Sequence, residues 1–486
     1  RVIQNKSNIE LSNWELVSIN PNKKDWNWKD LFCFWASNIQ TIIGFSLITS
    51  LYLLYDLNII IVFSGSLVAI ILVIFFSNLI GKPSQKYGIP FPVFLRLSMG
   101  INGARYVAIL RGIVATFMFG VQTFFLSKSF GYLIRISLFK YDNNFQEQEI
   151  FSYFYFGLDL IDWSSFILTI FLQVYLFKKG QDFIKAFINF SAIIVYSGLI
   201  IFCLIIASNN FAEITNILEN IFVLENIFKE SNIGPLLSVC GTMFAYFSIV
   251  ILNFGDFSRF VKSEGELKKG NYSLIINLIF FSIFSIFIVL GADIILNQNF
   301  TDLDKILTNP TDIIGKLDNA YLTIIVLIFI FFATASTNLI ANFIPSKYSL
   351  INFAPKTLNS NSSSVLIGII ALFVGGFWLS ILSQVGALSI IDTIGAFFGP
   401  VFGIVIADYY IIKKKELVIK DIFSSKKDSA YYFSGGWQIR SIFCLIIAFI
   451  FSAATIWNAD FRYLQSFSWL IGATVGFIMY YLVSKK

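Results

Sequence analysis

The chain contains no histidine, few charged residues and only four cysteines, which lie far apart in the sequence. The lack of histidine removes the commonest metal ligand and the usual imidazole proton relay. The cysteines show no CxxC spacing, so the sequence predicts neither a disulfide framework nor a zinc site. Charged residues make up 13% of the 486 residues, whereas a typical soluble domain has about 25%. These shortages argue against an ordinary soluble domain.

Long apolar runs take the place of the missing charges. Hydrophobic residues make up 57% of the chain, and its mean hydropathy is +0.75. A membrane-spanning helix needs about 20 apolar residues. Twelve runs approach this length, at approximately 29–54, 58–80, 106–133, 163–178, 185–207, 233–254, 272–296, 320–344, 364–385, 387–412, 438–457 and 463–483. We therefore predict an all-α polytopic membrane protein with 12 transmembrane helices.

The distribution of basic residues predicts the orientation of these spans. If the N-terminus is cytoplasmic, the segments on that side hold 28 of the 35 Lys and Arg residues, as the positive-inside rule requires. Segment 1–28 is polar and lacks an apolar signal core, so we expect a cytoplasmic N-terminal segment without a cleavable signal peptide. We expect a multi-pass protein of the plasma (inner) membrane with both termini cytoplasmic. The net charge of +6 reflects this topology, and we expect no nucleic-acid partner.

Polar residues interrupt three of the apolar runs at membrane depth, where such residues are costly and usually functional. They lie at Ala36–Gly44, at Gly241–Ser248 with Asn253 and Gly255 further on, and at Ala333–Asn338, the last followed by Asn342 and Pro345. The first two interruptions are five spans apart, as expected for two inverted repeats that each contribute one discontinuous helix. Small polar residues in spans can also serve helix packing. The amides of Gln40, Gln122 and Asn342 are harder to explain in that way.

A further segment, Lys82–Val93, separates the second and third spans and combines basic residues, proline and glycine. Its composition predicts a cytoplasmic loop. Four motifs in order along the chain, this segment included, resemble the nucleobase:cation symporter-1 family. They are Gly88-Ile89-Pro90-Phe91-Pro92-Val93 with Arg96 and Gly100, Phe119-Gly120-Val121-Gln122-Thr123, Leu252-Asn253-Phe254-Gly255-Asp256-Phe257-Ser258-Arg259, and Ala407-Asp408-Tyr409-Tyr410.

This resemblance implies a LeuT-type fold with a 5+5 inverted repeat. Segment 29–207 would hold helices 1–5, segment 233–412 helices 6–10, and segment 438–486 two C-terminal helices with the tail. The family imports nucleobases and related heterocycles such as uracil, cytosine, hydantoins and allantoin, driven by Na⁺ or H⁺. A cytoplasmic stretch, 1–28, would precede the repeats.

The resemblance also implies the residues of each site. A sodium ion would be held by the carbonyl groups of Ala36, Ile39 and Ala333 and the hydroxyl groups of Ser336 and Thr337. The substrate residues would be Gln40, Gln122 and Asn342 at the polar edge of the ring, Met118 and Phe247 at its faces, and Asn38 and Tyr246 nearby. Hydantoin-transporting members place tryptophan at the two stacking positions, so this chain offers a smaller and more pliable sandwich. Gly395, Gly399 and Pro400 would be either gating points or packing residues.

We therefore predict a secondary active transporter that imports a nucleobase or related small heterocycle by cation symport with alternating access. The Ser336–Thr337 pair favours Na⁺, and H⁺ stays open. The alternative is a LeuT-fold symporter for another small solute, such as a vitamin-precursor pyrimidine, an amino acid or a quaternary amine. An enzyme is disfavoured because no His, Asp or Glu residues cluster within the spans. We expect no catalytic residues, no cofactor besides the coupling ion, and a monomer in the lipid bilayer.

Overall fold

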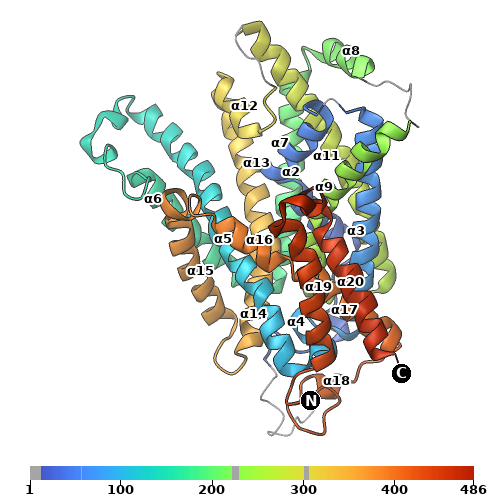
Figure 1. Ribbon diagram of the computed structural model, residues 1–486. Helices are drawn as coiled ribbons and strands as arrows, with labels where there is room; N and C mark the ends of the chain where they lie inside the picture. Colours follow the sequence, from blue (N-terminus) through green and yellow to red (C-terminus); the bar gives the residue numbers. More distant parts are fainter. Residues whose placement is uncertain (1–12, 56, 222–228, 300–305, 486) are drawn as a thin grey trace.

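The chain folds into a bundle of long helices that run roughly along one direction (Figure 1). This computed structural model describes residues 13–55, 57–221, 229–299 and 306–485. Ten helices in this part are long and apolar enough to cross a membrane, and an additional pair forms one span bent by 71°. A shorter apolar helix, Ser360–Gly376, occupies the ninth predicted run. The prediction of an all-α protein that spans the membrane many times is confirmed.

The spanning elements follow one another along the chain with short connections. They are α1 (Trp28–Ile39) with α2 (Ile42–Leu53), α3 (Ile59–Tyr87), α5 (Arg96–Tyr141), α6 (Leu160–Phe177), α7 (Gln181–Ala207), α9 (Ile233–Ile251), α11 (Glu264–Asn299), α13 (Ala320–Asn338) with the π-helical turn η6 (Leu339–Phe343) and α14 (Ile344–Phe353), α15 (Ser360–Gly376), α16 (Ala387–Gly395) with α17 (Phe398–Ala407) and the π-helical turn η8 (Asp408–Ile412), α19 (Ile439–Trp457) and α20 (Ser468–Ser484). The short helices α4 (Phe91–Phe94), α8 (Phe211–Ile221), α10 (Gly255–Ser258), α12 (Pro310–Lys316) and α18 (Ile419–Ile422) lie between them. The remaining turns are η2 (Pro21–Lys23), η3 (Phe145–Glu147), η4 (Glu149–Phe151), η5 (Glu230–Asn232), η7 (Trp378–Leu382) and η9 (Ala459–Phe467).

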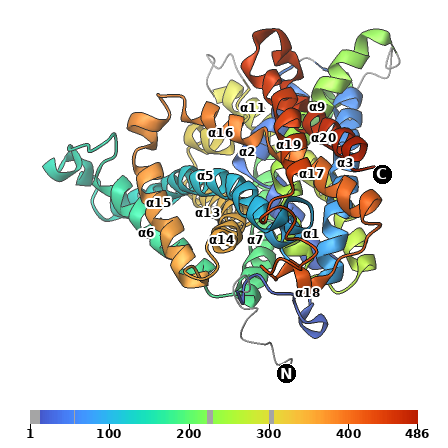
Figure 2. The ribbon, with the colours of Figure 1, turned by 60° about the horizontal axis from the view of Figure 1, so that its bottom comes forward.

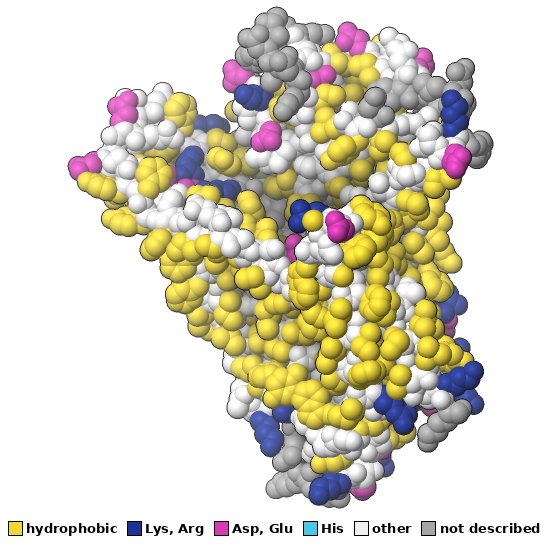
Figure 3. Space-filling view, viewed as in Figure 1, with side chains coloured by type: hydrophobic (Ala, Val, Ile, Leu, Met, Phe, Trp, Pro, Cys, Tyr) yellow, Lys and Arg dark blue, Asp and Glu magenta, His cyan; other side chains and the backbone are white. Residues whose placement is uncertain are grey.

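On the face shown in Figure 3, apolar side chains form a broad band across the middle, and most charged side chains lie toward the two ends. The C-terminal end of α20 lies at the lower end in Figure 1. The first described residues pack against loops at that same end, since Asn13 donates to the carbonyl groups of Pro355 and Leu358 and the Ile19 N–H donates to the Gly88 carbonyl. Figure 2 brings this end forward and shows α18 and the N-terminal segment on it. Both ends of the described chain thus lie at the same end of the bundle, as an even number of spans predicts.

The segment after the second span is more helical than its composition predicts. Helix α3 continues through Lys82 and Pro83 to Tyr87, so the loop prediction is wrong for residues 82–87. Proline cannot donate to the carbonyl four residues before it. The hydroxyl of Tyr410 donates to that carbonyl, on Leu79, at 2.8 Å instead. The helix ends at Gly88, whose φ of +69° suits glycine.

The break in the sixth span lies at the later residues of the predicted polar cluster, Asn253 and Gly255. Helix α9 is continuous through Gly241–Ser248, and the chain leaves the helix at residues 252–254, before α10. Two hydroxyl groups of this stretch are satisfied inside the helix, because Thr242 and Ser248 donate to the carbonyls of Ser238 and Ala245. Gly241 serves packing, since a Cβ there would lie 2.8 Å from the Phe467 ring.

Helices α17 and α20 pack closely through small residues. A Cβ on Gly399 would collide with the Trp469 carbonyl oxygen, and Pro400 lies against Gly472 and Gly476. Gly399 and Pro400 thus hold two backbones together at this seam. Gly395, in contrast, is the last residue of α16, next to the break in the tenth span. A gating role for Gly395, Gly399 and Pro400 stays a prediction.

Candidate functional site

The first span breaks where the sequence places its polar interruption. Helix α1 ends at Ile39, and α2 begins at Ile42 after a bend of 71°. The Thr41 side chain caps α2 by accepting from the Gly44 N–H at 2.7 Å. The carbonyls of Ala36 and Ile39 accept from the N–H groups of the two intervening residues, both at 2.9 Å. The break therefore places the C-terminal end of α1, with its carbonyl groups, inside the bundle.

Tyr246 on α9 bridges this break. Its hydroxyl donates to the Asn38 carbonyl at 2.7 Å and lies 2.7 Å from the Thr41 hydroxyl. The Asn38 side chain donates to the Phe34 carbonyl within α1. Phe247, the next residue, is buried, and its ring packs edge-on against Trp35 with 6.4 Å between centroids. Two predicted substrate residues of α9 thus lie directly against the end of α1.

We predict that Tyr246→Phe lowers the stability of the protein by about 1–3 kcal/mol. The substitution removes the hydroxyl and leaves the buried Asn38 carbonyl without its donor. Thermal unfolding of the detergent-purified protein measures the change. Tyr272→Phe on α11 is the control, since Tyr272 is 58% exposed. Equal unfolding temperatures for the two variants would show that the bridge contributes nothing.

The eighth span meets the first span at the break. The Thr337 hydroxyl on α13 lies 2.5 Å from the Ser37 carbonyl oxygen and 2.9 Å from that of Ala333. The Ser336 hydroxyl donates to Ala333 at 3.1 Å. All three α13 residues are buried, and the Ser37 hydroxyl has no hydrogen-bond partner. Carbonyl and hydroxyl oxygens from both helices therefore converge, as in transporter sites for alkali cations.

A cavity of about 410 Å³ extends from this junction toward the upper end of the bundle. Its lining comes from the start of α2, from α5, from the segment around α12 and from α13, and comprises Thr41, Ile42, Ile43, Gln122, Phe125, Lys128, Ser129, Tyr132, Asn309, Thr311, Asp312, Thr334 and Thr337. Figure 3 shows a hollow between the projecting end of α5–α6 and the top of the bundle. The cavity is roomy enough for a small heterocycle.

Of the predicted substrate residues, Gln122 is the one among the lining residues of this cavity. Gln122 lines it, and its Oε1 atom has no hydrogen-bond partner. Met118 lies one helical turn earlier on the same face of α5 and is half-buried. Gln40 lines a separate crevice of about 10 Å³. Both polar atoms of the Gln40 amide are buried without a partner, which is costly unless a ligand or a rearrangement supplies one.

Asn342 lies deeper, in the π-helical turn η6. Its Nδ2 atom donates to Asn338 Oδ1 at 2.9 Å, and Asn338 in turn contacts Gln173 of α6 and Thr123 of α5. Residues in π-helical turns often belong to functional sites. Sequence reasoning missed Gln173 and Asn338 as site residues. The signal that could reveal them is the rarity of amide side chains at membrane depth.

Arg111 on α5 is a second residue that sequence reasoning missed. It is buried, its Nε atom donates to Asn253 Oδ1 at 3.1 Å, and its Nη2 atom donates to the Ala341 carbonyl at 2.6 Å. Its guanidinium lies 5.7 Å from the ring centroid of Phe398. The Ala341 carbonyl lacks its usual helical donor because residue 345 is proline. Arg111 thus contacts the irregular parts of the sixth, eighth and tenth spans.

Asp256 on α10 lies close to this arginine. Burial raises the pKa of its carboxyl to about 7, against the hydrogen bond from the Phe91 N–H and the charges of Arg259 and Arg111. The ordinary value is 3.8. Between these values the folded state holds a proton that the unfolded state releases, so the contribution of Asp256 to stability declines as the pH rises from about 4 to about 7.

We therefore expect Asp256→Asn to flatten the dependence of stability on pH. Between pH 5 and pH 8, the fall in unfolding temperature should be smaller in this variant than in the unmodified protein. Asp428→Asn, at an exposed position, is the control. An unchanged slope in Asp256→Asn would show that another group carries the dependence.

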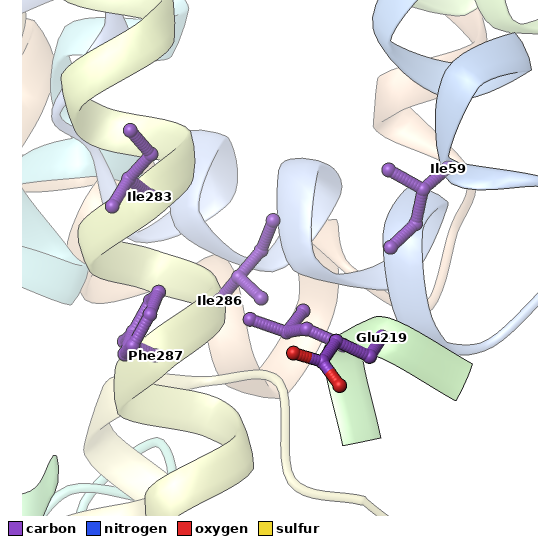
Figure 4. Close-up of a pocket in the computed structure, with 6 residues that line it drawn as sticks. Ile59, Glu219, Ile283, Ile286 and Phe287 are labelled. Atoms are coloured by element: carbon purple, nitrogen blue, oxygen red, sulfur yellow. The ribbon is translucent and has the colours of Figure 1, made fainter. Parts of the chain in front are cut away.

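A hollow of similar volume, about 410 Å³, lies between α3, α8 and α11 (Figure 4). Its lining consists of Ile59, Leu218, Ile283, Ile286 and Phe287 with the single carboxylate of Glu219. None of the predicted site residues lines it. A surface of this kind offers almost no hydrogen-bonding partners to a polar ring, so the cavity beside Gln122 is the candidate site.

Solved structures share this architecture. The structure of Mhp1, a nucleobase-cation-symport-1 family transporter, in a closed conformation with bromovinylhydantoin bound, has a TM-score of 0.69. The two chains are 17% identical, and the match covers 97% of this chain and 95% of that chain. A Na⁺-coupled sialic acid symporter gives a TM-score of 0.65 at 12% identity, covering 96% and 91% of the two chains. The fold is therefore the LeuT-type fold of membrane transporters, and the predicted fold class is confirmed.

The sequence defines the family. The model for permeases for cytosine/purines, uracil, thiamine and allantoin matches residues 18–484, so the chain belongs to this permease family and is a membrane transporter rather than an enzyme. An allantoin permease of Bacillus subtilis is 26% identical over 99% of this chain and 94% of its own length. A purine-uracil permease of Arabidopsis thaliana is 23% identical over 90% of this chain and 70% of its own length. The resemblance seen in the sequence is confirmed.

Proposed function

We propose that this protein imports a nucleobase, allantoin or a related small heterocycle together with Na⁺ by alternating access. One observation carries the proposal: the Thr337 hydroxyl meets the Ser37 carbonyl at the broken first span, beside a polar cavity that Gln122 lines. Two relatives, an allantoin permease and a purine-uracil permease, support this substrate class. The likeness to two cation symporters supports coupling to a cation.

The cation would bind between α1 and α13. Its ligands would be the carbonyls of Ala36, Ile39 and Ala333 with the hydroxyls of Ser336 and Thr337. Binding there would link the two spans and raise the affinity for the solute by linkage. One charge moved across 100 mV contributes about 2.3 kcal/mol, which sustains an accumulation of the solute of about 40-fold.

The heterocycle would bind at the inner end of the cavity. Gln122, Gln40 and Asn342 would serve its polar edge, because each amide offers both a donor and an acceptor. Met118 and Phe247 would pack against its faces. Asn38 and Tyr246 would keep the break in the first span in the shape that the site needs. Met118 and Phe247 are smaller than the two tryptophans of hydantoin-transporting members, so this pair favours a single small ring or a ureide.

Transport would proceed by movement of the repeats, helices 1–5 in 29–207 and helices 6–10 in 233–412, around the site. Helix α16 ends at Gly395 and would bend over the cavity, while α17 is held by α20 in segment 438–486. The end of the bundle that holds segment 13–28 would face the cytoplasm. The protein would work as a monomer in the plasma membrane.

Binding to the purified full-length protein tests the proposal. Thermal unfolding would be followed with uracil, cytosine, hydantoin, allantoin, a pyrimidine vitamin precursor, an amino acid and choline, each in Na⁺ and in K⁺. We expect one of the nucleobases, hydantoin or allantoin to raise the unfolding temperature, and to do so more in Na⁺. A shift in unfolding temperature with the amino acid or choline alone would establish the alternative solute class. Equal shifts in Na⁺ and K⁺ would contradict the proposed coupling to Na⁺.

A further inference from the structure

Four buried side chains behind the proposed substrate site form a continuous hydrogen-bonded chain. Asn342 Nδ2 donates to Asn338 Oδ1 at 2.9 Å. Asn338 Nδ2 donates to Gln173 Oε1 at 2.9 Å and to Thr123 Oγ1 at 3.1 Å. Gln173 Nε2 donates to Thr123 Oγ1 at 2.9 Å. The chain connects α13 and η6 with α6 and α5.

The far end of this chain fixes its direction. The Thr123 hydroxyl donates to the Phe119 carbonyl at 2.7 Å, and a carbonyl can only accept. A hydroxyl has a single hydrogen, so Thr123 Oγ1 can only accept from Gln173 and Asn338. Both amides must therefore turn their NH₂ groups toward Thr123, which leaves Asn338 Oδ1 facing Asn342.

Asn342 has no freedom left in this arrangement. It must turn its NH₂ group toward Asn338, because Asn338 presents an acceptor there. The one side-chain hydrogen bond of Asn342 within the described part of the chain uses Nδ2. The carbonyl oxygen, Oδ1, accepts no hydrogen bond from the described part of the chain and is the atom that can serve a ligand.

The same network also holds the part of α5 that faces the cavity. Thr123 follows Gln122 in the sequence, and Phe119 follows Met118. Asn338 Nδ2 also lies 3.4 Å from the Phe119 carbonyl oxygen. Three of the proposed substrate contacts are therefore positioned by one set of buried hydrogen bonds.

We propose that Asn338 and Gln173 are positioning residues that hold Asn342 with its carbonyl oxygen toward the transported solute. The site then selects a heterocycle or ureide that offers an N–H at this position and rejects one that offers an acceptor or a methyl group there. This inference rests on the proposed function, because it takes Asn342 as a substrate contact. It deepens that function by assigning the donor and acceptor pattern of the substrate edge.

Binding of matched ligand pairs to the full-length purified protein tests the inference. The probes are uracil, hydantoin and allantoin, each compared with its singly N-methylated derivatives. The unmodified protein should bind one parent compound at least about tenfold more tightly than one of its methyl derivatives, the factor expected for one oriented hydrogen bond. In Asn338→Leu the Asn342 amide can turn, so the affinity for the parent should fall about tenfold while that for the methyl derivative changes little.

Two substitutions of Thr123 form a matched pair for a second test. Thr123→Val removes the acceptor that orients both amides and should reduce the discrimination, whereas Thr123→Ser keeps the hydroxyl and should preserve it. Unfolding temperature and size-exclusion profile report on the fold of each variant. If Asn338→Leu does not fold, the Thr123 pair decides.

The possible results separate the inference from the proposed function. If the unmodified protein binds none of the probes, the proposed function fails and the inference fails with it. If it binds them with the expected preference but Asn338→Leu and Thr123→Val weaken parent and methyl derivative by the same factor, the proposed function stands and the positioning role is overturned. A loss of discrimination with retained binding supports both.

Discussion

Uptake of the transported heterocycle at concentrations below saturation should fall by about tenfold or more when Gln122 is replaced by alanine. The Gln122 amide lines the cavity with a free Oε1 atom, so its removal costs the hydrogen bonds that it makes to the ring. It also leaves a polar group of the bound ring without a partner, a loss of about 1–3 kcal/mol in total. Each 1.4 kcal/mol corresponds to about tenfold in affinity. Uptake of radiolabelled uracil or allantoin into cells or proteoliposomes measures the effect.

The control for this substitution is Gln148→Ala, at an exposed position outside the spans. Both variants should reach the membrane in the same amount, as shown by immunoblotting of the membrane fraction. Normal uptake by Gln122→Ala would remove Gln122 from the site. Other residues that line the cavity would then have to contact the solute, and Lys128 and Tyr132 on the same helix would be the next positions to replace.

The stimulation of solute binding by Na⁺ should disappear in Thr337→Val. Valine has nearly the shape of threonine but lacks the hydroxyl, so the junction between α13 and the end of α1 loses one of its converging oxygens. The affinity for Na⁺ should drop by at least about tenfold, the effect of a lost charge-assisted contact of about 1.5–3 kcal/mol. Titration of Na⁺ against the thermal shift produced by the bound heterocycle measures this affinity.

Thr323→Val is the matched control on the same helix. The Thr323 hydroxyl bonds to the Asn319 carbonyl at the other end of α13. The Thr323→Val substitution should therefore leave the Na⁺ titration unchanged. A normal titration in Thr337→Val would place the cation elsewhere, whereas heterocycle binding that is independent of Na⁺ in the unmodified protein would point to H⁺ as the coupling ion.

The all-helical class, the presence of many membrane spans and the break in the first span could be predicted from the sequence. Apolar length has few alternatives in a membrane, and Gln40 and Thr41 occur in the middle of a span, where an unbroken helix would have to bury them. Thr337 was placed beside the first span through the family resemblance. Its hydrogen bond to the Ser37 carbonyl joins residues 300 positions apart.

Local composition did not show which of the other polar residues and prolines interrupt a helix. The Gly241–Ser248 stretch also interrupts an apolar run, but the Thr242 and Ser248 hydroxyls bond within α9 and Gly241 accommodates Phe467. Pro83 suggests a helix end, yet the Tyr410 hydroxyl from the tenth span donates to the Leu79 carbonyl in place of the N–H that proline lacks. Whether a polar residue or a proline breaks a helix depends on distant partners, and one sequence does not show them.

Arg111 restricts which conformations the transporter can visit. A buried guanidinium that loses its partners costs several kcal/mol, so every state along the transport cycle must offer acceptors to this side chain or admit water to it. Its present acceptors belong to the sixth and eighth spans, and the ring beside it belongs to the tenth. A rearrangement of one of these spans alone would strand the charge. The sixth, eighth and tenth spans are therefore expected to move together during the transport cycle.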